Sequence, residues 1–206
     1  MARPFLTDSS KAALAAAVRT VESCCSAEVV VAVRSRTGSY LHADLIAGLL
    51  AGLAALAVLI GSPWTFEPVW FLVDPMVVGA LAGLVVSRGT LLRRTLTPRC
   101  ERRSRIGTAA RSTFVERRVH STSGRTGILL YVSVLEREAA VVVDLGVEAL
   151  AATDGWRKAV GEIETAVRGG ADGNEVAERL RGLGALLSPV LARGEDDVNE
   201  LPDEVC

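Results

Sequence analysis

The sequence predicts an α/β protein, namely a small α/β/α sandwich that is interrupted by a transmembrane two-helix hairpin. Three observations predict this fold class. Two long apolar segments lie in the middle of the chain and are flanked by basic residues. Short apolar runs rich in β-branched residues, typical of strands covered on both faces, lie before and after these segments. Stretches with apolar residues at helical spacing accompany the runs.

The chain opens with a predicted helix and a predicted central strand. Polar residues 8–10 cap the helix start, and apolar residues then recur at helical spacing from Leu14 to Val21. The run at 27–33 is apolar on both faces, which indicates a strand buried between two layers. We therefore assign residues 1–40 to the first part of the α/β domain.

Residues 41–95 are predicted to form the transmembrane hairpin. A helix needs about 20 apolar residues to cross a hydrocarbon core of roughly 30 Å, and the segment at 41–62 reaches that length. In the second segment, Asp74 and Pro75 are expected to be the N-cap and first position of a helix running to about Thr95. The alternative is a buried hairpin in a soluble protein, but so apolar a pair would dominate a core this small.

The basic residues predict the orientation of the hairpin. Such residues are retained on the cytoplasmic side of membrane segments, and the loop at 61–67 contains no Lys or Arg. The arginines on the two outer flanks are Arg34, Arg36, Arg88, Arg93, Arg94, Arg99, Arg102, Arg103 and Arg105. We expect a multi-pass protein of the cell (inner) membrane with both termini in the cytoplasm. Because no cleavable signal peptide is visible, the first apolar segment is expected to be an uncleaved signal anchor.

Two pairs of glycines lie four residues apart in the apolar segments, Gly48 with Gly52 and Gly79 with Gly83. Glycines at this spacing let helix backbones approach closely. Their simplest use is to pack the two spans against each other, and the alternative is a homodimer formed through either pair. Asp74 lies near the outer end of its span, where a cap explains it more simply than an ion or proton role.

Residues 96–206 are predicted to complete the α/β domain and to end in an acidic tail. A helix begins after Thr97-Pro98, and two antiparallel strands follow within residues 127–144. Two amphipathic helices then begin at Asp154 and Asp172. Because a helical crossover joins the first two strands, we expect these strands to be parallel, with the hairpin inside the crossover.

Composition narrows the function classes. Half of the residues are hydrophobic and the formal net charge is −1, which fits a membrane protein with a modest globular part. The basic stretch lies beside the membrane segments and lacks interleaved aromatic residues, so we expect contact with the lipid bilayer and no nucleic-acid binding. The four cysteines have no spacing typical of zinc.

The candidate catalytic residues are Asp144, at the end of a predicted strand, and Asp154, at the start of a predicted helix. Strand ends are where α/β sheets place ligands. Phosphoryl transfer also needs an activated nucleophile or a metal cluster, and no glycine-rich phosphate loop accompanies the pair. The structural alternatives are a turn residue for Asp144 and an N-cap for Asp154. We therefore expect no substantial phosphatase turnover.

The acidic tail is the candidate site for a divalent cation such as calcium. Hard cations take several oxygen ligands. Five tail residues offer them: Asp196, Asp197, Asn199, Glu200 and Asp203. Their spacing does not match an EF-hand loop, and the alternative is a solvated acidic tail.

Several segments resemble the TPM domain, a family shared by a plant thylakoid-lumen protein, a photosystem II repair protein, a nematode receptor-modulating protein and many bacterial membrane proteins. The similar segments lie at 26–31, 125–133, 136–137, 141–144 and 199–203. The resemblance covers the chain outside the apolar segments. The chain also looks like a bacterial subset in which a two-helix membrane insertion follows the first strand.

The resemblance implies three functions. Some TPM domains are reported to bind calcium, an acid phosphatase activity has been attributed to plant members, and others are non-catalytic accessory domains. Family members usually place the domain outside the cytoplasm, and the predicted topology of this chain departs from that. We expect a non-catalytic, membrane-anchored module that binds a membrane or cytoplasmic protein partner. The alternatives are a divalent-cation-binding domain and a phosphatase-like hydrolase.

Overall fold

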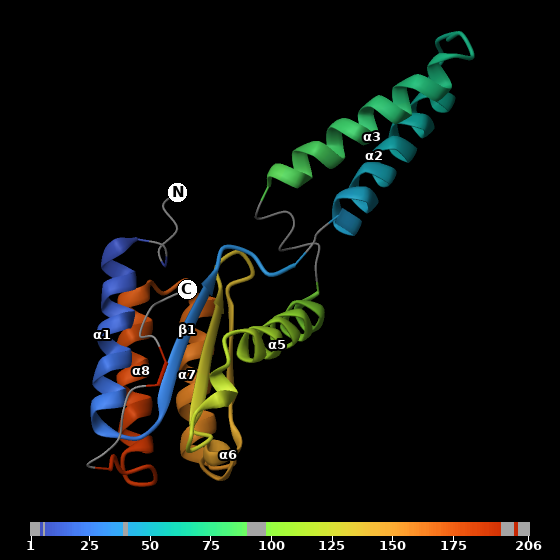
Figure 1. The fold of residues 1–206 in the computed structure, drawn as a ribbon. Coiled ribbons are helices and arrows are strands. Elements are labelled where there is room, and N and C mark those ends of the chain that lie inside the picture. The colour runs from blue at the N-terminus through green and yellow to red at the C-terminus, as the bar shows by residue number, and fades with distance from the viewer. Residues whose placement is uncertain (1–4, 6, 39–40, 90–97, 195–199, 202–206) are drawn as a thin grey trace. The chain divides into compact units, whose positions relative to one another are not determined.

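The computed structural model describes residues 5, 7–38, 41–89, 98–194 and 200–201, and statements about structure concern these residues. The chain divides into two compact units (Figure 1). The α/β unit is formed by Met1–Thr37 together with Arg102–Cys206, and the hairpin unit by Gly38–Glu101.

A three-stranded sheet with the order β1-β2-β3 forms the centre of the α/β unit. β1 (Glu28–Arg34) pairs in parallel with β2 (Gly127–Ser133), and β2 pairs antiparallel with β3 (Glu138–Val143). Both pairings were predicted and are confirmed. Every residue of β2 is buried, and in β1 only Arg34 is exposed, as expected for strands covered on both faces.

Three helices cover one face of the sheet. They are α1 (Asp8–Cys24), α7 (Asp154–Gly169) and α8 (Gly173–Leu187). α8 packs against both α1 and α7 (Figure 1). The predicted inward residues of α8 are all buried: Val176, Leu180, Leu183 and Leu187. Their spacing of three or four positions places them on one side of the helix, which is why the sequence pattern revealed this face.

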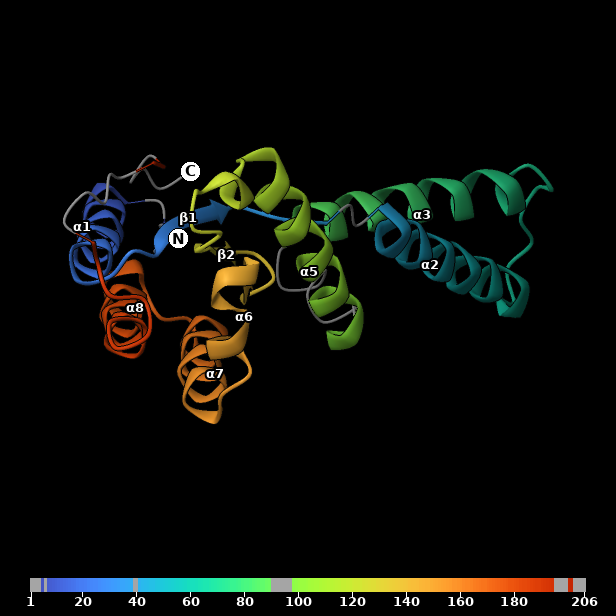
Figure 2. The ribbon, with the colours of Figure 1, turned by 60° about the horizontal axis from the view of Figure 1, so that its bottom comes forward.

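The opposite face of the sheet is covered by α5 (Arg99–Glu116) and the short 3₁₀ helix η1 (Val119–Ser121). Figure 2 shows α5 across the sheet from α7 and α8. Ile106, Ala110 and Phe114 form a second apolar core with side chains of β1 and β2, as their spacing predicted. Helices therefore lie on both faces of the sheet, and the predicted α/β fold is confirmed.

A short helix, α6 (Leu145–Ala151), was not predicted. It follows β3 directly, and the Gly146 N–H donates to the carbonyl oxygen of Arg125 at 2.8 Å. Seven residues make about two turns, which is too short for an apolar repeat to distinguish a helix from a loop.

The helix caps differ in part from those predicted. Thr7 caps α1 and Thr153 caps α7, each accepting the N–H three residues along the chain at 3.3 Å. Asp154 is therefore the first helical residue and not the N-cap of α7. Asp172, predicted to start the last helix, is the N-cap of α8, because its carboxylate accepts the Glu175 N–H at 2.9 Å. This hydrogen bond lowers the pKa of Asp172 below its ordinary value.

The hairpin unit consists of α2 (Leu41–Gly61) and α3 (Trp70–Arg88), which pack against each other. α3 begins earlier than predicted, so Asp74 is not an N-cap and Pro75 lies inside the helix. A proline inside a helix removes one backbone hydrogen bond and crowds the carbonyl group four residues earlier, yet α3 includes the apolar residues before Pro75. α3 also ends earlier than the predicted end near Thr95, which lies outside the described residues: its last residue is Arg88, and the N–H of the C-cap Gly89 donates to the carbonyl oxygens of Val85 and Val86.

Candidate functional site

Asp144, the first candidate catalytic residue, is held in an ion pair. Its carboxylate accepts hydrogen bonds from Arg125 Nε at 2.8 Å and Nη2 at 2.9 Å, and a third from the Leu145 N–H at 2.8 Å. The paired carboxylate raises the pKa of Arg125 above its ordinary value. Asp144 therefore joins the end of β3 to the start of α6, which it caps.

Asp154, the second candidate, has a different partner. Its side chain is 97% exposed and pairs with Arg157 at 3.3 Å. Asp144 and Asp154 flank α6 on opposite sides, and the seven residues of that helix extend about 10 Å. Each carboxylate thus pairs with a different arginine and lies at the start of a different helix, so the two do not form one site.

Asp144 also lies at the amino edge of the parallel strands, not at their carboxyl edge. Because β3 is antiparallel, its last residue, Val143, pairs with Ile128 near the start of β2. The Asp144 N–H accordingly donates to the carbonyl oxygen of Gly127 at 2.9 Å. Ligands bind open α/β sheets outside the carboxyl ends of the strands, so this rule indicates a different set of residues.

A buried polar cluster occupies the carboxyl edge of β1 and β2. We name it the carboxyl-edge cluster, and it contains Thr37, Arg102, Tyr131, Ser133 and Glu136. Thr37 Oγ1 donates to Ser133 Oγ at 2.7 Å and lies 3.0 Å from the Tyr131 hydroxyl. The Ser133 hydroxyl in turn donates to the Glu136 carboxylate. Ser133 is completely buried and Glu136 is 2% exposed, so these two residues lie in the interior, whereas Thr37 is half-buried.

Glu136 binds the two chain segments that flank the hairpin unit. Its carboxylate accepts the Thr37 N–H at 3.0 Å, and its carbonyl oxygen accepts Arg102 Nη1 at 3.4 Å. Thr37 is the last residue of the α/β unit before the hairpin, and Arg102 is the first after it. Arg102 is 6% exposed, and its Nε has no hydrogen-bond partner among the described residues. The β2–β3 turn thus holds both ends of the insertion.

Sequence reasoning missed this cluster. Arg102 was interpreted only as one of the arginines that set membrane orientation. Ser133 and Glu136 fall in segments that resemble the TPM domain, which was the available signal, but no role was assigned to them. Thr37 carried no signal, because its partners lie more than 90 positions away along the chain.

Only one of the five candidate cation ligands, Glu200, lies within the described residues. Its carboxylate accepts the Ser123 N–H at 2.9 Å and the Ser123 hydroxyl at 2.6 Å. The other four lie outside them: Asp196, Asp197, Asn199 and Asp203. Within the described part of the chain, no three His, Cys, Asp or Glu side chains converge as a metal site requires.

The glycines of the hairpin unit lie at the α2–α3 contact. A Cβ added to Gly48 would lie 2.8 Å from the carbonyl oxygen of Gly79, and one added to Gly79 would lie as close to that of Gly48. Gly52 has the same relation to the carbonyl oxygen of Pro75. The prediction that these glycines pack the two apolar helices together is confirmed. Homodimerisation through either pair stays a prediction.

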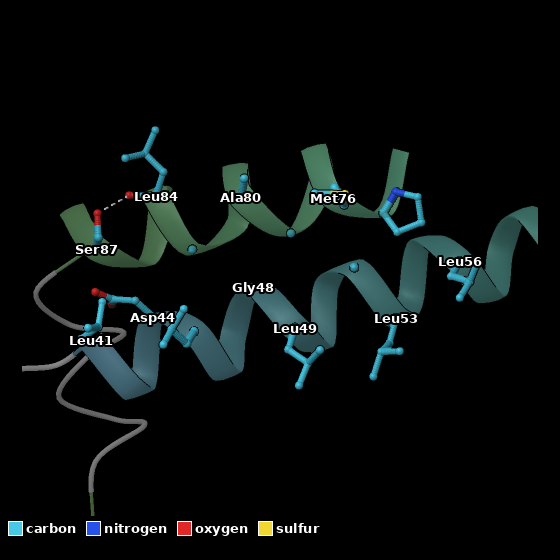
Figure 3. A pocket seen from close by; sticks show the side chains of 15 residues that line it. Leu41, Asp44, Gly48, Leu49, Leu53, Leu56, Met76, Ala80, Leu84 and Ser87 are labelled. Atoms are coloured by element: carbon cyan, nitrogen blue, oxygen red, sulfur yellow. Dashed lines mark hydrogen bonds between the residues drawn. The ribbon is translucent and has the colours of Figure 1, made fainter. Parts of the chain in front are cut away.

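The remaining surface of the hairpin is apolar. α3 has no buried residue, and Leu49 on α2 is 64% exposed. A groove of about 700 Å³ runs between the helices beside the glycines, with Asp44 and Ser87 at one end (Figure 3). By length and composition, Asp44–Gly61 and Trp70–Arg88 are each sufficient to cross a membrane.

Comparisons with known proteins support the fold alone. No protein-family model and no curated protein matches the chain. The chain is similar to a solved structure, the NMR structure of BA42 protein from the psychrophilic bacterium Bizionia argentinensis. The match covers 98% of this chain and 94% of that one, with a TM-score of 0.59 and 16% sequence identity. The resemblance to the TPM domain stays a prediction.

Proposed function

We propose that this protein is a membrane-anchored α/β domain that acts as a non-catalytic, partner-binding module at the cytoplasmic face of the bacterial inner membrane. The apolar surface of the hairpin unit carries the proposal. α2 and α3 contact each other through glycines and expose large apolar side chains elsewhere. Keeping such surface in water is unfavourable by roughly 25 cal/mol per Å², whereas a bilayer core accommodates it.

The pairing of the sheet supports a hairpin that crosses the membrane twice. β1 precedes the hairpin unit in the chain, and β2 follows it, yet the two strands are hydrogen-bonded neighbours. The segments on either side of the insertion must therefore lie on the same side of the membrane. An even number of spans satisfies this condition, and the hairpin contains two candidate spans.

The charges support a cytoplasmic location for the α/β unit. The connection between α2 and α3 has no Lys or Arg, whereas Arg88 ends α3 and several arginines begin α5. Basic residues close to membrane segments are retained in the cytoplasm. The connection between the spans would then lie on the outer side.

The contacts of the candidate carboxylates support a binding role over a catalytic one. Asp144 caps α6 and pairs with Arg125, and Asp154 pairs with Arg157 at the start of α7. Tyr131 and Ser133 of the carboxyl-edge cluster are buried, so their hydroxyl groups are not presented to a substrate. These polar groups have structural partners, which fits a domain that acts by presenting a surface.

Labelling of cysteines in intact cells tests the topology. Thr65→Cys places a reporter in the predicted outer loop, and Cys206 is the native reporter for the C-terminus. Cys24 and Cys100 are exposed and are replaced by Ser. We expect a membrane-impermeant reagent to label the reporter at position 65 but not Cys206. External labelling of Cys206 contradicts the proposal.

Hydrolysis of a generic phosphate ester, with and without divalent cations, tests the non-catalytic role. We expect no rate above background for the wild type. Asp144→Asn and Asp154→Asn provide the comparison, because removing a catalytic carboxylate lowers a rate by orders of magnitude. As structural changes they should be mild, since Asn retains a capping oxygen at position 144 and the ion pair lost at position 154 is exposed. A robust rate that either substitution abolishes in a folded protein contradicts the proposed role.

A further inference from the structure

The end of the described chain docks onto the amino edge of the sheet. Glu28 is the first residue of β1 and is 7% exposed, in a strand that is otherwise apolar up to Arg34. Its carboxylate accepts the backbone N–H groups of Glu200 and Leu201, each at 3.3 Å. The side chain of Leu201 packs against the apolar core between the sheet and α5.

The side chain of Glu200 makes a separate contact with the loop that precedes β2. Both of its oxygens are bound by Ser123, one by the N–H and the other by the hydroxyl. We define the amino-edge site as Glu28, Ser123 and the apolar core that Leu201 contacts. The site thus recognises three features of one short segment: its backbone N–H groups, a carboxylate and the aliphatic side chain that follows.

We propose that the amino-edge site is a peptide-binding site for a protein partner, and that the chain's own Glu200-Leu201 occupies it until the partner displaces it. This inference rests on the proposed partner-binding function and gives that function a location. The partner's segment contains a Glu followed by a Leu. Proline is excluded at these two positions, because Glu28 requires an N–H from each.

The contacts of Glu200 and Leu201 are those of an exchangeable segment. The two hydrogen bonds to Glu28 are longer than the usual distance of about 2.9 Å for N–H···O. The contacts between Ser123 and Glu200 are exposed to water, which competes for both groups. Leu201 is only partly buried.

Tethering favours occupation of the site by the chain's own segment. A segment linked to its own site has an effective concentration of the order of millimolar. A free peptide must exceed this concentration or bind more tightly to displace it. A partner on the same membrane gains a similar advantage, because anchoring also raises its local concentration.

Peptide binding to the full chain in detergent micelles tests the proposal. The probe is a fluorescent peptide with the sequence of residues 195–206, in which Ser replaces the terminal Cys. The release variant is Glu200→Ala with Leu201→Ala. The control is Glu178→Ala, which removes an exposed carboxylate of α8. Fluorescence anisotropy is measured for the wild type, the release variant and the control.

We expect the release variant to bind the peptide about tenfold or more tightly than the wild type and the control, because its tethered competitor is lost. Ser123→Ala added to the release variant should weaken binding several-fold, because it removes the hydroxyl that donates a hydrogen bond to the peptide's Glu carboxylate. A peptide with Ala at the positions of Glu200 and Leu201 should not bind. If circular dichroism shows that the release variant is unfolded, Glu200→Ala alone replaces it.

Two results overturn the proposal. One is a release variant that fails to bind the peptide or binds it no better than the wild type does. The other is a concentration-dependent wild-type dimer that is lost in the release variant, because a second copy would then be the occupant. The assay does not depend on membrane orientation. External labelling of Cys206 would therefore refute the topology alone, and failed peptide binding would refute this site alone.

Discussion

The α2–α3 and α1–α8 helix pairs both come into close contact through glycines, but their other faces carry different side chains. In the α1–α8 pair, a Cβ on Gly184 would lie 3.0 Å from a methyl of Val21, and one on Gly173 would lie 2.5 Å from the Cβ of Ser10. A Cβ added to Gly48, Gly52 or Gly79 would lie 2.8 Å from a backbone carbonyl oxygen of the other helix, and one added to Gly83 would lie 3.2 Å from one. Both pairs therefore depend on the absence of a side chain at the contact.

The other faces of the two pairs are opposite in character. α8 buries an apolar stripe and presents charged residues such as Glu175 and Arg179 at the surface. α2 and α3 bury little besides the glycine contact and present leucines outward. Glycine packing thus shows only that two helices are in contact. Whether the outer face of the pair is charged or apolar indicates whether that face is suited to water or to lipid. The hydrophobic effect stabilises α8 against the sheet in water, but it supplies no such force between helices in lipid.

The largest expected difference between the pairs concerns buried and exposed leucines. Leu180 of α8 is completely buried, and Leu180→Ala should destabilise the α/β unit by about 2–5 kcal/mol through lost burial and a cavity. Leu49→Ala, on the outer face of α2, should leave that stability unchanged. Urea unfolding in a mild detergent measures both. Equal losses would mean that the hairpin contributes a packed core of its own.

A charge on the outer faces should distinguish the pairs almost as strongly. Leu53→Arg places a guanidinium near the middle of α2, where membrane insertion should lose about 2.5–3.5 kcal/mol. Gly182→Arg, at an open position of α8, is the matched control and should be tolerated. The membrane-bound fraction after cell lysis measures the effect. Normal membrane association of the Leu53 variant argues against a span at α2.

Enlarging a contact glycine should have an intermediate effect. Gly79→Leu forces a side chain against the backbone of α2, and overpacking of this kind costs about 1–3 kcal/mol. Gly61→Leu is the control in the same hairpin, since nothing lies within 4 Å of the added Cβ. Crosslinking between cysteines introduced on α2 and α3 reports the contact. Similar yields for the two variants would show that the helices do not touch through Gly79.

The smallest effect concerns the cap of α8 and its pH dependence. The pKa of Asp172 is lowered in the folded state by the hydrogen bond from the Glu175 N–H. The contribution of Asp172 to folding stability is therefore present above the unfolded pKa of about 3.9, and it is lost as pH falls through the lower pKa of the folded state. Asp172→Asn retains a capping oxygen that does not titrate. Urea unfolding from pH 7 to pH 2.5 should show wild type losing stability relative to the variant only below about pH 4. Parallel curves throughout would rule out this linkage.

Local patterns in the sequence determined the order and type of most elements. Apolar runs on both faces identified β1 and β2, and residues three or four apart identified the buried sides of α5 and α8. These features follow from side chains within one strand or a few helical turns. α6 was missed because it is shorter than such a pattern, and α3 was begun too late because Pro75 was taken as its start.

Only the tertiary structure decided which polar groups meet. The antiparallel pairing of β3 places Asp144 at the amino edge, whereas Thr37, Arg102 and Glu136 meet at the carboxyl edge. Glu28 meets Glu200 from 172 positions away. A hydrogen bond depends on the distance and direction between two groups in space. Strand order, register and loop path set that geometry for residues far apart in the chain, and no local pattern carries this information.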